Sequence, residues 1–138
     1  MNSQNIQHYE SIMYAIKNGY NLLDTATNYQ GGNSENLIGD VLKNNIDFKD
    51  KVFIITKTGY IPNKYKITKE LKVFLNLNSI EKAIIDDDFE YSIDPLYLDY
   101  QIESSLKKMN RSYIDCYLLH NPERLLMDRN GRDKKYIY

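Results

Sequence analysis

The amino-acid sequence predicts an α/β fold in which parallel strands alternate with helices. Three short apolar runs have the composition of buried strands, and each run ends at a charged or polar residue. Helical patterns stand between these runs, and parallel strands require connections of that kind. Ionisable side chains at the carboxyl ends of parallel strands are suited to an active site at the mouth of an α/β barrel.

The first helix and the first strand are predicted near the N-terminus. Residues 5–18 repeat apolar side chains at the three- and four-residue spacing of an amphipathic helix. Its apolar face consists of Tyr9, Ile12, Met13 and Ile16. Gly19 is suited to the left-handed conformation that closes a helix. A first strand is expected from Tyr20 to Ala26, and its apolar residues stop at Asp24.

A polar loop and a second helix follow the first strand. Residues 25–33 are mostly small or polar, and Tyr29 lies among them. Ser34 is the expected helix N-cap, and Glu35 favours the positive end of the helix dipole. The buried face of this helix is expected to consist of Leu37, Ile38, Val41 and Leu42. The pair Gly31-Gly32 is accompanied by neither of the common phosphate-loop patterns.

The second and third strands end in the same way as the first. Val52–Thr56 is apolar and β-branched, as expected for a strand covered on both sides, and Lys57 follows it. The third strand is predicted from Tyr113 to Leu119 and runs into His120. Because alternate residues of a strand share a face, Asp24, Lys57 and His120 can all point to one side of the sheet.

The helix before the third strand begins at the dipeptide Asp94-Pro95. Aspartate is a good N-cap, and proline is favoured at the first helical position. The apolar stripe of this helix is expected to consist of Leu98, Ile102, Leu106 and Met109. Residues 110–112 are expected to end it.

Residues 60–93 and the C-terminal tail carry weaker signals. The stretch 60–93 is long for a connection, so an insertion or a long, partly structured functional loop is expected there. Within it, Asp86–Asp88 lacks the spacing of a Ca²⁺ loop and is interpreted as a solvated acidic turn. Residues 127–138 are charged and aperiodic, so a frayed tail is expected. By length, residues 1–138 together are expected to form one domain.

The composition argues against several classes of function. The formal charge of −1 gives no basic surface, so neither nucleic acid nor a membrane is an expected partner. With a single cysteine, Cys116, and two histidines, no metal site is expected. The N-terminus lacks a signal peptide's apolar core, and no apolar run approaches the roughly 18 residues of a membrane span. A cytoplasmic location is therefore the expectation.

Taken singly, the candidate residues also have purely structural explanations. Asp24 could end a strand and accept hydrogen bonds from loop amides, while Lys57 could be a solvated residue beyond a strand. His120 could brace the turn that Asn-Pro forms, and Tyr29 is one of thirteen tyrosines. Their functional interpretation therefore depends on their occurrence together.

Four segments of the sequence resemble the aldo-keto reductases and occur in that family's order. The segments are GYNLLDTATNYQGGNSENLIGDVLK, VFIITKTG, QIESSLKKMN and YIDCYLLHNPE. Members of the family are (β/α)8 barrels that use a nicotinamide cofactor, usually NADPH, to interconvert carbonyl compounds and alcohols. The resemblance implies a partial (β/α)8 TIM barrel that acts on an aldehyde, a ketone or a sugar. NADPH is the implied cofactor, and NAD is the alternative.

The resemblance also assigns roles to individual residues. The family's catalytic tetrad falls on Asp24, Tyr29, Lys57 and His120. Tyr29 would protonate the alkoxide that hydride transfer leaves, and the Lys57 ammonium would favour the ionised phenol. Asp24 would hold Lys57 in place, and His120 would orient the carbonyl group. Asn121 would lie beside the substrate, and Asp24 and Asn121 are the implied cofactor contacts.

The length of the chain departs from this family. A TIM barrel typically takes about 250 residues, whereas these 138 residues hold three recognisable strands. The resemblance therefore implies that residues 1–138 form a single incomplete domain, the N-terminal and central part of a barrel. An open parallel sheet exposes unpaired edges, so a homo-oligomer that covers them is a possible partner arrangement. The alternative function is a catalytically inactive fragment that acts only as an oligomerising α/β module.

Overall fold

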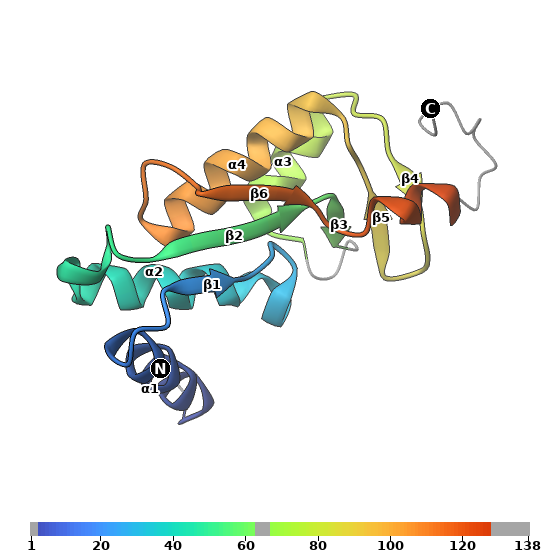
Figure 1. Ribbon diagram of the computed structural model, residues 1–138. Coiled ribbons are helices and arrows are strands. Elements are labelled where there is room, and N and C mark those ends of the chain that lie inside the picture. Colours follow the sequence, from blue (N-terminus) through green and yellow to red (C-terminus); the bar gives the residue numbers. More distant parts are fainter. Residues whose placement is uncertain (1–2, 63–66, 128–138) are drawn as a thin grey trace. The chain divides into compact units, whose positions relative to one another are not determined.

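The structure, a computed structural model, describes residues 3–62 and 67–127 (Figure 1). The chain divides into two compact units. Within the described residues, the first unit consists of residues 3–57 and 102–118, and the second consists of residues 58–62, 67–101 and 119–127. The expected frayed tail lies outside the described residues from residue 128 onward.

A three-stranded sheet forms the centre of the first unit. Its strands are β1 (Leu22–Asp24), β2 (Phe53–Thr58) and β6 (Cys116–Leu119), in the order β1-β2-β6. β1 and β2 run parallel, with Leu22 opposite Phe53 and Asp24 opposite Ile55. The sequence prediction of an α/β fold with parallel strands and alternating helices is confirmed.

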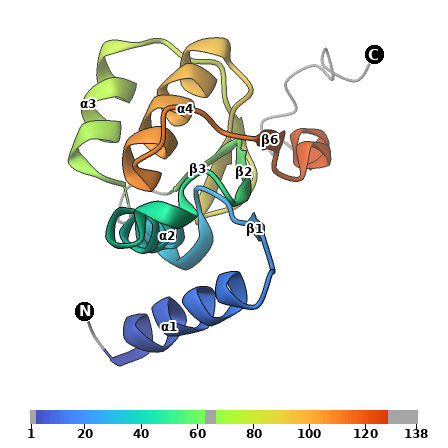
Figure 2. The same cartoon turned by 60° about the vertical axis from the view of Figure 1, so that its left-hand side comes forward.

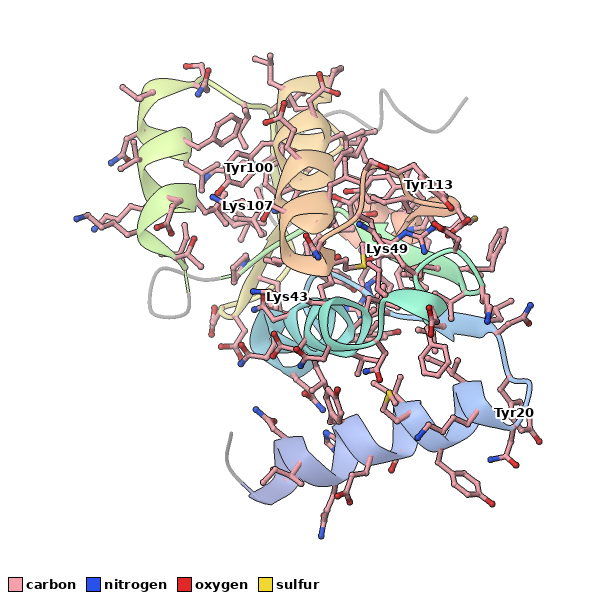
Figure 3. The ribbon with its side chains drawn as sticks, turned by 90° about the vertical axis from the view of Figure 1, so that its left-hand side faces the viewer. Tyr20, Lys43, Lys49, Tyr100, Lys107 and Tyr113 are labelled. Carbon is pink, nitrogen blue, oxygen red and sulfur yellow. The ribbon has the colours of Figure 1, made fainter. Side chains whose placement is uncertain are left out.

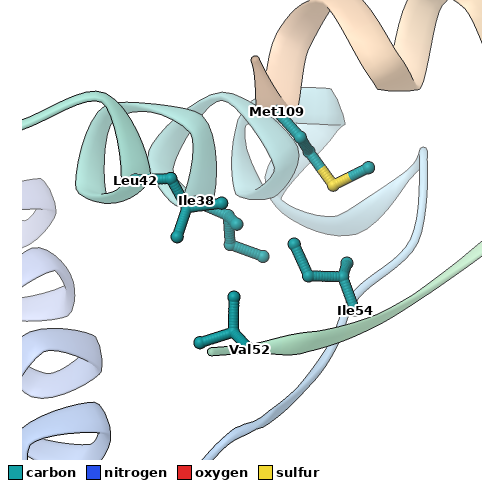
Figure 4. Close-up of a cluster of buried hydrophobic side chains, with 5 residues drawn as sticks. All are labelled: Ile38, Leu42, Val52, Ile54 and Met109. Carbon is teal, nitrogen blue, oxygen red and sulfur yellow. The ribbon is translucent and has the colours of Figure 1, made fainter. Parts of the chain in front are cut away.

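Helices cover one face of β2 and enclose the core of the first unit. α1 (Ser3–Lys17) lies beside α2 (Asn33–Asn44), as Figure 2 shows. α2, β2 with the residue before it, and the C-terminal end of α4 (Pro95–Met109) supply a buried cluster, drawn in Figure 4. The cluster consists of Ile38, Leu42, Val52, Ile54 and Met109. Burying an apolar side chain of this size contributes about 1.5–3 kcal/mol.

A buried carboxylate and a glycine bring α2 and α4 close together. Glu35 is fully buried, accepts a hydrogen bond of 2.7 Å from Thr56 Oγ1 and lies 3.2 Å from Lys108 Nζ. A Cβ atom added to Gly39 would lie 2.0 Å from the Lys108 carbonyl oxygen. The two helices can therefore approach this closely only because residue 39 has no side chain.

Arg111 joins the end of α4 to β2 and to the start of β6. Its guanidinium donates to the Lys49 and Val52 carbonyls at 2.7 and 3.2 Å. It also pairs with Asp115 at 3.1 Å, and its Cζ atom lies 4.3 Å from the centroid of the Tyr113 ring. Asp115 accepts the Ile54 amide at 2.8 Å. β6 begins at Cys116 rather than at the predicted Tyr113, and Asp115, directly before it, contacts the sheet through its side chain.

The second unit contains a small antiparallel sheet. The strands are β3 (Tyr60–Pro62), β4 (Ala83–Ile84) and β5 (Phe89–Tyr91), in the order β3-β5-β4. The Asp86 carboxylate accepts the Asp88 and Phe89 amides at 2.8 Å, which closes the turn between β4 and β5. The interpretation of the acidic triplet as a turn is confirmed.

Helix α3 (Lys69–Leu77) and the first part of α4 pack together in the second unit. The Phe74 and Tyr100 rings are stacked, with centroids 4.4 Å apart. Figure 3 shows Tyr100 pointing from α4 toward α3. Thr68 caps α3 by accepting the Leu71 amide at 3.2 Å. Residues 60–93, which the sequence left unassigned, thus contain three short strands and a helix within the described residues.

Three local predictions were wrong in detail. Ser34 lies inside α2 rather than capping it, because Gly32 adopts a left-handed φ of 91° and lets the helix begin at Asn33. β1 spans three residues instead of seven. The fully buried residues of α4 include Tyr97 and Ser105 in addition to Met109. The Tyr97 hydroxyl donates a hydrogen bond of 2.7 Å to the Tyr60 carbonyl oxygen, so a residue with a polar group can occupy a buried helix face that hydrophobicity alone does not mark.

No helix in the described part of the chain combines the length and the apolar character needed to cross a membrane.

Candidate active site

Lys57 is the centre of a polar cluster in the first unit. The Cα atom of Asp24 is opposite that of Ile55, and Lys57 lies two residues further along β2, on the same face of the strand. The Lys57 ammonium forms an ion pair with the Asp24 carboxylate. It also donates a hydrogen bond of 2.8 Å to the Thr25 carbonyl oxygen. The ammonium is therefore held by two oxygen atoms at the end of β1.

Tyr29 completes this cluster from the loop after β1. Its ring centroid lies 5.2 Å from Lys57 Nζ, within the range of a cation–π contact. The loop stays close to β2 because Thr25 N donates to the Ile55 carbonyl at 2.8 Å and Thr27 N donates to the Lys57 carbonyl at 3.1 Å. The first unit thus brings a carboxylate, an ammonium group and a phenol together.

A short 3₁₀ turn, Tyr29–Gly32, returns the chain from the site to α2. Gln30, Gly31 and Gly32 have φ values of 52°, 65° and 91°, so three successive residues are left-handed. Glycine adopts this conformation without steric cost, which explains the pair of glycines that the sequence places here. The turn lets Tyr29 lie beside Lys57 while α2 begins four residues later at Asn33.

The exposure of the three side chains differs. The Lys57 side chain is 14% exposed, whereas the Asp24 side chain is 53% exposed and Tyr29 is 40% exposed. The cation is therefore well enclosed by its partners, while the phenol and the carboxylate face solvent. A small molecule can reach Tyr29 in this arrangement.

His120 and Asn121 belong to the second unit and are held by contacts there. His120 N donates to the Thr58 carbonyl at 2.8 Å, and its ring meets the Tyr60 ring at 5.2 Å and 86°. Asn121 adopts a left-handed φ of 55°, and its Nδ2 lies 3.5 Å from Tyr60 Oη. The structure thus groups Asp24, Tyr29 and Lys57 in one unit and His120 with Asn121 in the other.

Two contributors to these clusters were missed by the sequence analysis. Thr25 holds Lys57 through its backbone carbonyl, and a backbone acceptor leaves no signal in residue type. Tyr60 contacts both His120 and Asn121, but it is one of thirteen tyrosines. The available signal for Tyr60 is its position, three residues after Lys57, where β3 begins.

The first cluster has the composition of a proton-transfer site. A phenol is a weak acid, and a neighbouring ammonium stabilises the phenolate that remains after proton donation. The carboxylate balances the charge of the ammonium. Among the described residues there is no group of three or more histidine, cysteine, aspartate or glutamate side chains that could hold a metal ion.

Comparison with known proteins shows the family. The Aldo/keto reductase family profile matches residues 2–129, which is most of the chain. The chain therefore belongs to the aldo/keto reductase family.

Curated relatives share more than a quarter of the aligned residues. The NADH-specific methylglyoxal reductase of Escherichia coli (strain K12) is 28% identical over 111 residues, covering 80% of this chain and 30% of that protein. The aldo-keto reductase YhdN of Bacillus subtilis (strain 168) is 29% identical over 130 residues, covering 94% of this chain and 32% of that protein. The chain thus spans about a third of the length of these relatives.

A solved structure supports the fold. The holo form of aldo-keto reductase AKR11C1 from Bacillus halodurans aligns with a TM-score of 0.61 at 22% identity. The alignment covers 84% of this chain and 31% of that chain. The described structure therefore has the fold of part of a TIM barrel.

Proposed function

We propose that the chain takes part in the NAD(P)H-dependent reduction of a carbonyl compound to an alcohol. The observation that carries this proposal is the Lys57 ammonium, which pairs with Asp24 and lies 5.2 Å from the Tyr29 ring centroid. Family membership over residues 2–129 supports it. The chain spans about a third of the length of its curated relatives. That it catalyses the reaction of a complete reductase is therefore proposed.

Tyr29 is the proposed proton donor. As the substrate carbon gains hydride, negative charge develops on its oxygen, and the Tyr29 hydroxyl gives its proton to that oxygen. The phenolate that remains is stabilised by the Lys57 ammonium. Asp24 and the Thr25 carbonyl hold the ammonium in place, so the stabilising charge is in position before the reaction begins.

His120 and Asn121 are the proposed carbonyl-binding residues. An imidazole N–H and a carboxamide N–H are both donors that can orient a carbonyl oxygen by hydrogen bonding. His120 is half-buried and Asn121 is exposed, so the carboxamide is open to a ligand. Aldehydes, ketones and sugars in their open form are the substrates that such donors accept.

A nicotinamide cofactor supplies the hydride in this proposal. The Asp24 carboxylate and the Tyr29 phenol are exposed, so a nicotinamide ring would have access to the first cluster, and the residues fit that group. Asp24 and Asn121 are the proposed contacts of the nicotinamide end. One relative is an NADH-specific enzyme by name, so both NADPH and NADH are to be tested.

The test of the catalytic role is turnover by the Tyr29→Phe variant. NAD(P)H oxidation with a panel of aldehydes, ketones and sugars is measured for the wild type, for Tyr29→Phe and for Tyr20→Phe. Tyr20 is 71% exposed and lies outside the cluster, so its variant is a matched control. The proposal predicts that Tyr29→Phe loses turnover while Tyr20→Phe keeps it. Equal rates in all three proteins would contradict it.

A second function is favoured by apolar side chains that the sheet leaves exposed. Leu22 is 57% exposed, and its register partner Phe53 is 43% exposed. Leu118 of β6 is 42% exposed. An uncovered apolar sheet face favours association with a further protein surface. The alternative is therefore a catalytically inactive module that associates with a second copy through this face.

Sedimentation velocity tests the association. A dimer or larger oligomer that becomes monomeric in Phe53→Ser, and not in a control substitution of the exposed Lys43, would support the module. A monomeric wild-type chain at high concentration would count against it.

A further inference from the structure

Aromatic side chains of the second unit converge on Tyr60. Its ring makes edge-to-face contacts with Phe89, Tyr91 and His120, at centroid distances of 5.4, 5.3 and 5.2 Å. The interplanar angles are 70°, 83° and 86°. Such perpendicular arrangements are electrostatically favourable for aromatic pairs. Tyr60 itself is 8% exposed, so its ring is largely shielded from solvent.

Tyr60 makes polar contacts at both its backbone and its hydroxyl. Its carbonyl oxygen accepts a bond of 2.7 Å from the buried Tyr97 hydroxyl, which in turn accepts a bond of 3.0 Å from Gln101 Nε2. At the other end, its hydroxyl oxygen lies 3.5 Å from Asn121 Nδ2. The ring can therefore change its orientation only if several neighbours move with it.

Tyr91 packs against the backbone that precedes Tyr60. A Cβ atom on Gly59 would lie 2.3 Å from Tyr91 Cζ, so the Tyr91 ring rests directly on the backbone before Tyr60. Tyr91 is fully buried, and burial is the main cause that raises the pKa of its hydroxyl. The group next to Tyr60 is therefore a neutral, closely packed ring.

The contacts of Tyr60 reach the two residues that the proposed function assigns to the carbonyl oxygen. The backbone of His120 is fixed by its bond to Thr58, and its imidazole meets the Tyr60 ring. Asn121 has a strained left-handed backbone, and its carboxamide meets the Tyr60 hydroxyl. One buried side chain thus touches both carbonyl-binding groups.

We propose that Tyr60 is a positioning residue that orients the His120 imidazole through its ring and the Asn121 carboxamide through its hydroxyl. The roles of His120 and Asn121 in this inference rest on the proposed function, but their orientation by Tyr60 does not. Tyr60 acts only by holding these two residues in position and takes no part in proton transfer. The expected consequence of this positioning is a preference for substrates whose carbonyl oxygen fits the His120 and Asn121 donors.

Nuclear magnetic resonance of the full chain tests the orientation without any need for turnover. The chain has two histidines, so His8 of α1 is an internal reference for His120. Removal of the ring in Tyr60→Leu is expected to abolish its ring-current shift at His120 and to leave His8 unchanged. The substitution Tyr14→Leu is the control, since Tyr14 is 71% exposed on α1.

The substitution Tyr60→Phe separates the two contacts and keeps the packing. His120 resonances should stay near their wild-type positions because the ring remains, while the Asn121 side-chain amide resonances should move because the hydroxyl is lost. If Tyr60→Leu does not fold, this variant still decides the second contact. Unchanged His120 resonances in a folded Tyr60→Leu protein, or unchanged Asn121 amide resonances in Tyr60→Phe, would overturn the proposal.

Kinetics give the functional consequence. Misplacing a reacting group by about 1 Å can cost on the order of 100-fold in rate, so Tyr60→Leu is expected to lower kcat/KM by up to that factor. Tyr60→Phe should recover most of the loss. An inactive wild-type chain would refute the proposed function while the resonance experiment still decided the orientation, so the two failures are distinguishable.

Discussion

The two units hold their polar residues by different means. In the first unit, Lys57 is fixed by charge and hydrogen bonding, through Asp24 and the Thr25 carbonyl. In the second unit, His120 is fixed by a backbone bond to Thr58 and by the packing of its ring against Tyr60. Charged residues at strand ends can be recognised in a sequence. The packing of one aromatic ring against another can be recognised only in the folded structure.

The substitution Lys57→Met in the first unit is expected to have the largest effect, and that effect is on turnover. This change removes the cation from the first cluster while keeping most of the side-chain volume. Loss of a group that assists proton transfer costs about 10²–10⁴-fold in rate, so kcat/KM should fall by that range. The exposed Lys43 of α2, labelled in Figure 3, provides the control Lys43→Met. Equal turnover by both variants would show that the cation in the cluster is not used.

A stability test of the first unit comes from Gly39→Ala. The added Cβ atom would lie 2.0 Å from the Lys108 carbonyl oxygen, so α2 and α4 must separate. Overpacking of this kind costs about 1–3 kcal/mol. Chemical denaturation measures the loss, and the neighbouring exposed residue supplies the control Asp40→Ala. A Gly39→Ala protein as stable as the control would refute the close helix approach.

The second unit is tested by the pH dependence of stability. Burial raises the pKa of Tyr91 above that of an unfolded tyrosine, so above about pH 10 the unfolded chain releases a proton that the folded chain keeps. The free energy of unfolding should therefore fall as pH rises, by up to about 1.4 kcal/mol per pH unit for this group. Tyr91→Phe should reduce that slope relative to the wild type. Identical slopes in the two proteins would mean that Tyr91 ionises as it does in the unfolded chain.

The smallest effect is expected at the start of α3. Thr68→Ala removes the hydroxyl that accepts the Leu71 amide, which costs about 1 kcal/mol for a typical N-cap. Thr68→Ser keeps the acceptor and should retain most of the wild-type stability. Thermal unfolding distinguishes the two variants. A Thr68→Ala protein that unfolds at the same temperature as Thr68→Ser would show that the cap does not stabilise α3.

The sequence predicted the parts of the fold that follow from periodicity and capping. The three parallel strands end near Asp24, Lys57 and His120, and the Asp94 side chain accepts the Leu96 amide at 2.9 Å at the start of α4. The strands of the second sheet were not predicted because they span only two or three residues, too few for an alternating pattern.

The candidate site was accessible from sequence only in part. Asp24 and Lys57 follow apolar runs, so their residue types and positions predict a shared strand end. The left-handed turn that lets Tyr29 lie beside Lys57 depends on three successive backbone conformations. The contact of Tyr60 with His120 joins residues sixty positions apart, and local pattern does not encode such a pairing.

Fluorescence titration of the purified chain with NADPH and with NADH is the most direct test of the central claim. The claim is that the cluster of Asp24, Lys57 and Tyr29 serves a hydride-transfer reaction. The account predicts saturable binding of at least one of the two cofactors at micromolar concentration. An absence of binding up to millimolar concentrations of both cofactors would contradict it, because the reaction that Tyr29 is proposed to assist would then have no hydride source.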